Sequence, residues 1–376
     1  MAIRYNSPAL NGNERSYALQ ALESGRIASG GAFTDSAEKL LSSVFQTSAA
    51  LLTTSCTHAL ELGARALDLG PGDEIIVPSF TFPTTASSFL WNGASVRFAD
   101  IRPDTQNIDL EHATSLINDR TRAICIVHYA GVGAQPDEFA KLCQRHGLTL
   151  IEDNAHGFGA TYKGQSLGSF GKLSTLSFHE TKNITCGEGG SLLVNDESLV
   201  EKCIVLRDKG TDRQNFLNGL VDKYTWRSNG SSYGPSEVLA AILLAQLEQW
   251  ERINGYRVSL WNRYRDDLAS WAARENVSLP FIPSGVEHPG HLFYLILPSS
   301  ESRSAFLDHM QLQDIGAVIH YQDLASSPFG SALSTRIGQL PNSLRASQRL
   351  VRLPLSSGLT SEEQEQVIER VLAFRA

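Results

Sequence analysis

The sequence has no run of about 18 apolar residues and no apolar leader after Met1, and its 376 residues include only five cysteines. Without such a run no helix can cross a bilayer. The cysteines show neither the CxxC spacing of a zinc site nor a dense disulfide framework. They are Cys56, Cys125, Cys143, Cys186 and Cys203. We therefore expect a soluble, cytoplasmic protein with reduced thiols and no membrane partner.

Charge of neither sign dominates the chain. The chain has 32 lysine and arginine residues and 40 aspartate and glutamate residues, so the net charge is −8. Residues of the two signs are interspersed along the sequence. This balance argues against a dedicated nucleic-acid surface, although it allows a local basic pocket for a phosphorylated ligand. A GxGxxG motif is also missing after the first strand-like run, which argues against a nicotinamide-binding domain.

Short apolar runs alternate with amphipathic stretches in the first half of the chain. The runs cover residues 49–54, 74–78, 95–99, 123–127, 148–152, 175–178 and 191–194. Residues 58–67 and 136–146 lie between such runs and have helical spacing. The alternation predicts an α/β fold with a mostly parallel seven-stranded sheet flanked by helices on both faces. In such sheets, ligands bind beyond the carboxyl ends of the strands.

The pattern in the second half of the chain predicts a different arrangement of helices and strands. One helical pattern runs from residue 236 to 271, and helical patterns also cover residues 302–311, 343–352 and 361–375. Residues 292–297 and 317–321 resemble strands. We expect a large ligand-binding domain over residues 1–250, including the N-terminal segment, and a smaller C-terminal α+β domain over residues 251–376.

Lys182 and Asp153 point to a specific chemistry. Lys182 lies in a loop just after an apolar run, and Asp153 ends another such run. A lysine amine can form a Schiff base with the aldehyde of pyridoxal phosphate, and a carboxylate beside the pyridine nitrogen keeps that nitrogen protonated. A loop lysine alone is usually a solvated charge, and an aspartate at a strand end is often a helix cap. Together, at one edge of a sheet, they predict a pyridoxal phosphate enzyme.

Hydroxyl and amide groups cluster beyond the first strand. Residues 53–58, TTSCTH, precede a helical segment, so free backbone amides gather where the helix dipole is positive. Ser177 adds a hydroxyl from the loop of Lys182, and the glycine-rich residues 187–190 let the backbone pass close to a ligand. These features fit a phosphate cradle, although a plain helix cap also explains residues 53–58.

Two ring side chains complete the candidate site. His156, three residues after Asp153, lies either against the cofactor or in a structural hydrogen bond. Phe82 follows the second strand and either stacks on the pyridine ring or belongs to the core.

These motifs resemble the sugar aminotransferases of the DegT/DnrJ/EryC1/StrS family, which have fold type I of pyridoxal phosphate enzymes. The resemblance covers nearly the whole chain. Its motifs are SFTF at 79–82, DIRPDT at 100–105, VHYAGV at 127–132, SFHETKN at 177–183 and DKYTWR at 222–227. They look like the branch that acts on dTDP-4-dehydro-6-deoxyhexose, which includes the dTDP-4-amino-4,6-dideoxygalactose transaminase of enterobacterial common antigen synthesis.

The resemblance implies a role for each matching residue. Lys182 would carry the Schiff base, Asp153 would pair with the pyridine nitrogen, and His156 and Phe82 would contact the cofactor. Cys56, Thr57 and Ser177 would hold the phosphate. In the family, an asparagine of the neighbouring subunit of a homodimer adds a phosphate contact, and Ser232 stands at that position here.

The substrate side of the site is less defined. Tyr321 lies in a family segment that usually continues with proline, leucine and histidine, whereas this chain has Gln322, Asp323 and Leu324. Arg26, Lys223 and Arg227 are candidates to hold the diphosphate of a sugar nucleotide, or are ordinary surface charges.

The resemblance implies transamination of a dTDP-4-dehydro-6-deoxyhexose. L-glutamate would be the amino donor and pyridoxamine phosphate the intermediate form of the cofactor, giving dTDP-4-amino-4,6-dideoxy-D-galactose and 2-oxoglutarate. The C4 epimer with the gluco configuration and a 3-amino sugar are alternatives. Further alternatives are a dehydratase or racemase, and a catalytically silent binding or regulatory protein on the same fold. Lys182 argues against a sugar 3-dehydratase, in which the family has histidine at that position.

Overall fold

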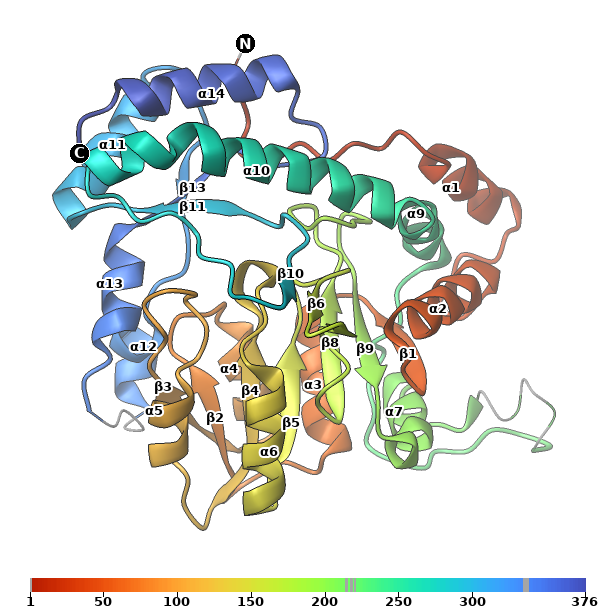
Figure 1. The fold of residues 1–376 in the computed structure, drawn as a ribbon. Coiled ribbons are helices and arrows are strands. Elements are labelled where there is room, and N and C mark those ends of the chain that lie inside the picture. The colour runs from red at the N-terminus through yellow and green to blue at the C-terminus, as the bar shows by residue number, and fades with distance from the viewer. Residues whose placement is uncertain (1, 214–215, 217–218, 220, 334–337) are drawn as a thin grey trace.

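A seven-stranded sheet forms the centre of the protein in a computed structural model, which describes residues 2–213, 216, 219, 221–333 and 338–376 (Figure 1). The strand order is β1-β9-β8-β5-β4-β2-β3, and only β9 runs antiparallel to its neighbours. The strands are β1 (Ala49–Thr53), β2 (Glu74–Pro78), β3 (Ser95–Ala99), β4 (Thr121–Val127), β5 (Thr149–Asp153), β8 (Leu173–Ser177) and β9 (Gly190–Val194). All seven strands predicted from the sequence are present, so the α/β fold with a mostly parallel sheet is confirmed.

Helices cover both faces of this sheet because successive residues of its strands, which point to opposite faces, are apolar. On one face, Ile75 and Val77 of β2 pack with α3 (Cys56–Ala66) and α4 (Thr84–Leu90). On the other face, Ile76 packs with α5 (Leu110–Ser115) and α6 (Pro136–His146). At the β1 end, α7 (Val200–Arg207) covers the first face, and α2 (Ala32–Phe45) and α9 (Glu237–Leu247) cover the second. Burial on both faces makes the strands continuous apolar runs.

The C-terminal part has its own core. An antiparallel sheet of β11 (Phe293–Ile296), β13 (Leu350–Leu353) and β12 (Val318–Ile319) packs against α10 (Trp250–Arg274) and α14 (Ser361–Ala373). Helix α10 reaches both cores, since Ile253 lies in the core around α2 and α9, and Leu260 to Trp271 lie in the C-terminal one. Ile3 also packs in the C-terminal core and bridges Ile315.

The remaining described elements are short or lie at the edges. They are α1 (Glu14–Glu23), β6 (Thr161–Tyr162), β7 (Gln165–Ser166), β10 (Val286–Glu287), α11 (Ser300–Gln311), α12 (Pro328–Ala332), α13 (Pro341–Arg349), and the 3₁₀ turns η1 (Tyr129–Gly131), η2 (Glu197–Leu199) and η3 (Leu324–Ser326). In the part of the chain that the structure describes, none of the helices has the length and apolarity needed to span a membrane.

The single helix predicted over residues 236–271 is wrong. The chain forms α9 and α10, which meet at Gln249, where the backbone leaves the helical region (φ −120°, ψ 11°). Neither proline nor glycine marks the break. Trp250 packs edge-on against Phe158, with ring centroids 5.9 Å apart. Phe158 is far from Trp250 in the sequence, and their contact accompanies the change of direction of the chain. The helical spacing of apolar residues therefore cannot reveal the break.

The helix predicted over residues 343–352 is also too long. Helix α13 ends at Arg349, and Leu350 begins β13. Because β13 lies between β11 and β12 and pairs with both, its extended conformation comes from tertiary hydrogen bonds that helical spacing does not indicate.

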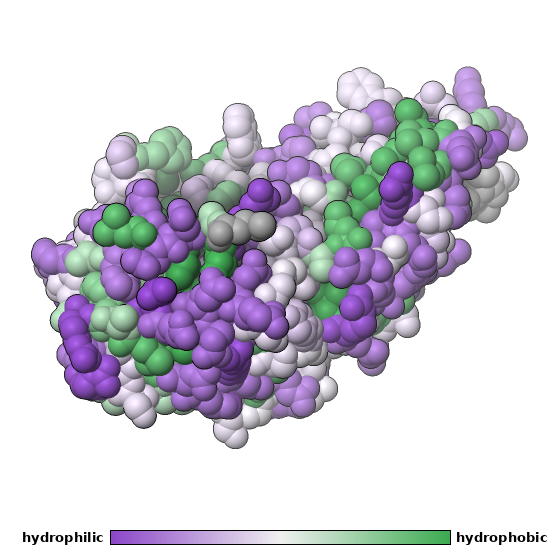
Figure 2. Space-filling view, turned by 90° about the horizontal axis from the view of Figure 1, so that it is seen from above, coloured by the Kyte–Doolittle hydropathy of each residue, from purple (hydrophilic) through white to green (hydrophobic). Residues whose placement is uncertain are grey.

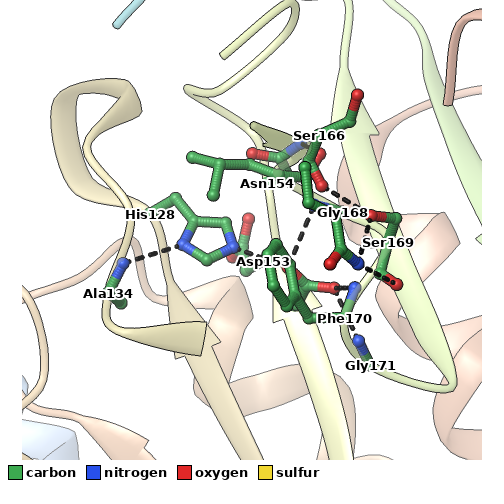
Figure 3. Close-up of polar contacts among 12 residues, drawn as sticks. His128, Ala134, Asp153, Asn154, Ser166, Gly168, Ser169, Phe170 and Gly171 are labelled. Carbon is green, nitrogen blue, oxygen red and sulfur yellow. Dashed lines mark hydrogen bonds and ion pairs between the residues drawn. The ribbon is translucent and has the colours of Figure 1, made fainter. Parts of the chain in front are cut away.

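A fully buried carboxylate ties the end of β5 to the loop that leads into β8. Glu152 accepts hydrogen bonds from the backbone amides of Gly168 at 2.9 Å and of Phe170 and Gly171 at 2.7 Å each. His128 Nδ1 accepts a hydrogen bond from the Ala134 amide (Figure 3). Nε2 therefore carries the proton and donates to Glu152 at 2.8 Å. Four donors therefore satisfy one buried carboxylate, which removes most of the cost of its burial.

We expect the substitution Glu152→Gln to lower the free energy of unfolding by about 2 kcal/mol or more, because an amide NH₂ group would face the backbone donors. Urea denaturation of the cofactor-free protein measures this change. Glu369→Gln, at an exposed position of α14, is the control and should leave the unfolding curve in place. An unchanged curve for Glu152→Gln would contradict the role given to this carboxylate.

Candidate active site

A cavity of about 710 Å³ lies at the carboxyl ends of the central strands. Val127, Asp153 and Ser177, which end β4, β5 and β8, all line it. Strand β9 starts at the same edge, because Gly190 pairs with both Thr53 and Ser177. The prediction that these strand ends would meet on one rim is confirmed.

Lys182 lines this cavity from the loop between β8 and β9. Its amide donates to the His179 carbonyl at 2.9 Å, which forms a tight turn after β8. Burial lowers the pKa of Lys182 to about 8, and the positive charge of Arg352 acts in the same direction. The carboxylate of Asp153 opposes this shift. A lysine with this pKa is partly neutral near pH 7, as a nucleophile or base must be.

Asp153 is buried in the wall of the same cavity. One carboxylate oxygen accepts from the Thr85 hydroxyl at 2.7 Å, and the other accepts from the Ala155 amide at 3.2 Å. Burial raises the pKa of Asp153, although these hydrogen bonds and the charge of Lys182 reduce the rise. A cationic ring nitrogen beside the carboxylate would remove the remaining cost of its burial. Asp153 thus fits the partner of a protonated pyridine.

The residues predicted to form a phosphate cradle lie at the start of α3 and at the end of β8. The helix begins at Cys56, so the first-turn amides of Cys56 and Thr57 have no intrahelical acceptor, and Ser55 caps the helix by accepting from the His58 amide. Cys56, Thr57 and Ser177 all line the cavity. Gly190 allows this arrangement, because a Cβ atom there would lie 2.4 Å from the Cys56 amide nitrogen. Amides, hydroxyls and a helix dipole suit a phosphate.

Rings form one wall of the cavity. His156 Nδ1 accepts from the Ala130 amide at 3.3 Å, so Nε2 carries the proton and donates to the Tyr321 hydroxyl at 3.0 Å. Burial holds the pKa of His156 well below its usual value, which keeps this imidazole neutral. His291 stacks on His156, with centroids 4.3 Å apart. Phe82 is 53% exposed, so it belongs to the cavity lining and not to the core.

Four predicted site residues lie outside the cavity lining of a single chain. Arg26, Lys223, Arg227 and Ser232 are exposed. Arg227 pairs with Asp212 at 3.2 Å, and Ser232 forms a β-bridge with Asp208. The contact expected of Ser232 belongs to a neighbouring subunit, so its position in one chain is compatible with that prediction.

Several cavity residues were not predicted from the sequence. They are Tyr5, Thr81, Thr84, His179, Thr181, Glu188, His291, His320 and Arg352. Tyr5 comes from the N-terminal segment and His320 and Arg352 from the C-terminal sheet. Thr81 and Thr84 follow β2, and His179, Thr181 and Glu188 lie between β8 and β9, so the strand ends gave a signal for this group. The other four residues, Tyr5, His291, His320 and Arg352, follow no strand of the large sheet.

Asp323, in the segment that departs from the family pattern, anchors the loop of Tyr321 to the rim of the large sheet. Its carboxylate accepts hydrogen bonds from the Ser79 hydroxyl and, at 3.2 Å, from the Ser326 amide. The Leu324 amide donates to the Ser79 carbonyl at 2.9 Å, and the Ala325 amide donates to the Ser79 hydroxyl at 3.0 Å. Asp323 therefore places Tyr321 against His156.

A cavity lysine and a buried carboxylate beside a helix N-terminus, at the carboxyl edge of this sheet, define a pyridoxal phosphate enzyme of fold type I. The chain belongs to the DegT/DnrJ/EryC1/StrS aminotransferase family, whose model matches residues 8–372. The family predicted from the motifs is thus confirmed.

Relatives cover most of the chain. The pleiotropic regulatory protein of Geobacillus stearothermophilus is 32% identical over 323 residues, which make up 85% of this chain and 82% of that protein. The spore coat polysaccharide biosynthesis protein SpsC of Bacillus subtilis is 29% identical over 378 residues, covering 98% and 96%. The putative sugar aminotransferase Spr1654 from Streptococcus pneumoniae, solved in a PLP-form, has a TM-score of 0.91 at 25% identity, covering 99% of this chain and 98% of that chain. A PMP-form of it is also solved.

We expect the rate of Schiff-base formation between cofactor-free protein and pyridoxal phosphate to rise with pH and to level off above about pH 8, because only the neutral amine of Lys182 reacts. Stopped-flow absorbance from about pH 6 to about pH 10 measures this profile. Nα-acetyl-lysine amide, whose one amine is that of the side chain, is the reference, and its rate should rise further, toward its pKa of about 10.4. A protein profile that follows the reference would contradict the lowered pKa.

We expect Asp323→Asn to loosen residues 321–326, since the amide would place a second donor against the Ser79 hydroxyl. Hydrogen–deuterium exchange should show faster exchange of the Leu324 and Ala325 amides. The exposed residue Asp308 on α11 gives the control Asp308→Asn, which should leave this segment unchanged. Equal protection in both variants would show that Asp323 does not hold the loop.

Proposed function

We propose that the protein is a sugar aminotransferase that transfers an amino group from L-glutamate to C4 of a dTDP-4-dehydro-6-deoxyhexose, giving dTDP-4-amino-4,6-dideoxy-D-galactose and 2-oxoglutarate. The observation that carries the proposal is Lys182, with a pKa lowered to about 8, in one cavity with the buried carboxylate of Asp153. The family supports transamination, and the motifs at 79–82, 100–105, 127–132 and 222–227 support the substrate class.

Pyridoxal phosphate, when bound, supplies an electron sink for a carbanion at the carbon that bears the amine. Asp153 would hold the proton on its ring nitrogen, and the amides of Cys56 and Thr57 with the Ser177 hydroxyl would hold its phosphate. His156 and Phe82 would lie against the ring. The names of relatives agree with this cofactor, since Spr1654 has a PLP-form and a PMP-form.

Lys182 would move the proton. Its amine would act as the base that removes the proton from the α-carbon of the donor and as the acid that protonates the sugar carbon that receives the amine. With a pKa of about 8, about one lysine in ten is neutral at pH 7. The face of the sugar carbon that Lys182 protonates decides between the galacto product and its gluco epimer.

The site would be completed by a second copy of the chain. Ser232 would reach the phosphate of the neighbouring subunit in a homodimer, and Arg26, Lys223 and Arg227 would meet the diphosphate there. Figure 2 shows hydrophobic side chains on the surface toward the end of the molecule that carries α1. Leu10, Leu19, Leu22 and Ile27, in and around α1, are each at least 49% exposed, and apolar side chains that gather on one part of a surface are typical of an interaction site.

A regulatory protein on the same fold is the second candidate, because a relative is named as a pleiotropic regulatory protein. A binding protein does not need a lysine amine in the cavity. Conversion of the bound cofactor by L-glutamate alone distinguishes an enzyme from such a protein.

The test is to incubate the protein with pyridoxal phosphate, L-glutamate and dTDP-4-dehydro-6-deoxyglucose and to determine the product by NMR. We expect the amino group at C4 to be axial, which identifies the galacto product. The product and 2-oxoglutarate should form in equal amounts. Lys182→Ala should abolish the product and the visible absorbance of the Schiff base, because Lys182 is the only lysine among the described residues that line the cavity.

Lys39→Ala, at an exposed position of α2, is the matched control and should keep full activity. Turnover retained in Lys182→Ala would overturn the assignment of the lysine. An amine at C3, or the gluco epimer, would replace the proposed product while keeping the reaction class.

A further inference from the structure

Asn183, the residue that follows Lys182, ties the loop of the lysine to the C-terminal part of the chain. Its side-chain amide is buried and takes part in three hydrogen bonds. Nδ2 donates to Oδ1 of Asn254 and to the Pro289 carbonyl, each at 2.8 Å. Oδ1 is paired with Nδ1 of His291 at 2.9 Å. One side chain therefore bonds to α10 and to the segment that precedes β11.

The partners of this amide fix its orientation. A backbone carbonyl only accepts hydrogen bonds, so the atom that faces Pro289 is the NH₂ group. The oxygen then faces His291, and Nδ1 of that ring carries the proton. Asn254 is held in turn, because its Nδ2 donates to the Phe158 carbonyl at 2.9 Å. Both N–H groups and the oxygen of Asn183 are used, so the amide has one arrangement.

Helix α10 also holds the segment that Asn183 contacts. Arg257, which is buried on this helix, donates to the carbonyls of Gly290 at 3.1 Å and His291 at 2.5 Å. Asn254 lies three residues before Arg257, so the two side chains share a face of the helix. Helix α10 therefore supports Asn183 directly through Asn254 and indirectly through His291.

The lysine loop, residues 178–189 between β8 and β9, is otherwise closed on itself by hydrogen bonds. The amide of Phe178 donates to the Gly189 carbonyl, and that of Glu180 donates to the Gly187 carbonyl, each at 2.8 Å. In the described part of the chain, the hydrogen bonds made by the other side chains of the loop stay within it. The polar anchor of this loop on the C-terminal side is thus the residue next to the lysine.

We propose that Asn183 is a positioning residue for Lys182, and that its three hydrogen bonds fix the backbone that carries the lysine and keep the amine in the cavity. A planar peptide bond joins the two residues, so a fixed Asn183 restricts the path of Lys182. The inference depends on Lys182 as the reacting amine of the site and not on which sugar is aminated.

The surroundings of Lys182 decide what a loosened loop would do to the amine. Burial is the largest cause of its lowered pKa, and the groups that act on it next are those of Cys56, Asp153 and Arg352. Arg352 is itself held, because its Nη1 donates to the Tyr5 hydroxyl at 2.7 Å. Three histidines of the cavity are neutral near pH 7, since burial holds their pKa values well below the usual one: His156, His291 and His320. An amine that regains contact with water therefore has a higher pKa.

The experiment measures Schiff-base formation between cofactor-free Asn183→Ala and pyridoxal phosphate, by stopped-flow absorbance from about pH 6 to about pH 10. The rate of the unchanged protein should level off above about pH 8. In Asn183→Ala this plateau should move up by about one pH unit or more, because the pKa of Lys182 returns toward that of a free lysine. At pH 7 the rate should fall about tenfold.

Gln364→Ala is the matched control. Gln364 also has a buried amide, which donates to the Leu260 carbonyl at 2.6 Å, and it does not line the cavity. Its loss should lower the free energy of unfolding in urea, as that of Asn183 does, but leave the pH profile in place. A shift of equal size in Gln364→Ala would overturn the inference, because a loss of stability alone would then explain it.

Nuclear magnetic resonance of protein with ¹⁵N-labelled histidine tests the hydrogen bond itself. The spectrum of the cofactor-free protein should show His291 with its proton on Nδ1, and His291→Asn identifies the signal. A proton on Nε2 would contradict the bond on which the inference rests.

A profile of Asn183→Ala that still levels off above about pH 8 would also overturn the inference. Near-ultraviolet circular dichroism checks that this variant is folded. If it is not, Asn254→Ala, which removes one of the three bonds, decides by the same profile: a smaller upward shift supports the inference, and an unchanged profile overturns it. If L-glutamate does not react with the unchanged protein, the proposed donor is wrong, whereas the Schiff-base profile still reports on Asn183.

Discussion

Two adjacent carboxylates, buried at the end of one strand, set the constraint on which the rest of the site depends. Successive side chains of a strand point to opposite faces of a sheet, so Glu152 and Asp153 cannot share an environment. Glu152 is satisfied by three backbone amides and His128, and this fixes the loop that leads into β8. Asp153 faces the cavity. The rigid position of the first carboxylate holds the second in the wall of the cavity.

Much of the large sheet could be predicted from the sequence. Strands buried on both faces are short apolar runs, and the polar residues that follow them collect at one edge, which is why Asp153, Ser177 and Cys56 could be placed together before any coordinates. The break at Gln249 and the strand at Leu350 could not be predicted, since each is determined by packing partners about 90 or 60 residues away, Phe158 for the first and Phe293 to Ile296 for the second.

The cavity residues divide in the same way. Lys182, Asp153, Thr57 and Phe82 follow strands of the large sheet and were found by that rule. Tyr5 and Arg352 follow none, and their position depends on how the two ends of the chain meet, which local patterns do not contain. The roles of Ser232 and Arg227 are of a third kind, because a single chain does not hold the surfaces that they are expected to contact.

The bond between Tyr5 and Arg352 joins residues 347 positions apart. During synthesis from the amino terminus, Tyr5 is made 347 residues before its partner, which follows only after all strands of the large sheet have been made. The strands of the large sheet can therefore pair before Arg352 is made, and the wall of the cavity that contains Arg352 closes later. A chain shortened by a premature stop after α9 would retain Lys182 and Asp153 but would lack the part of the site contributed by the C-terminal sheet.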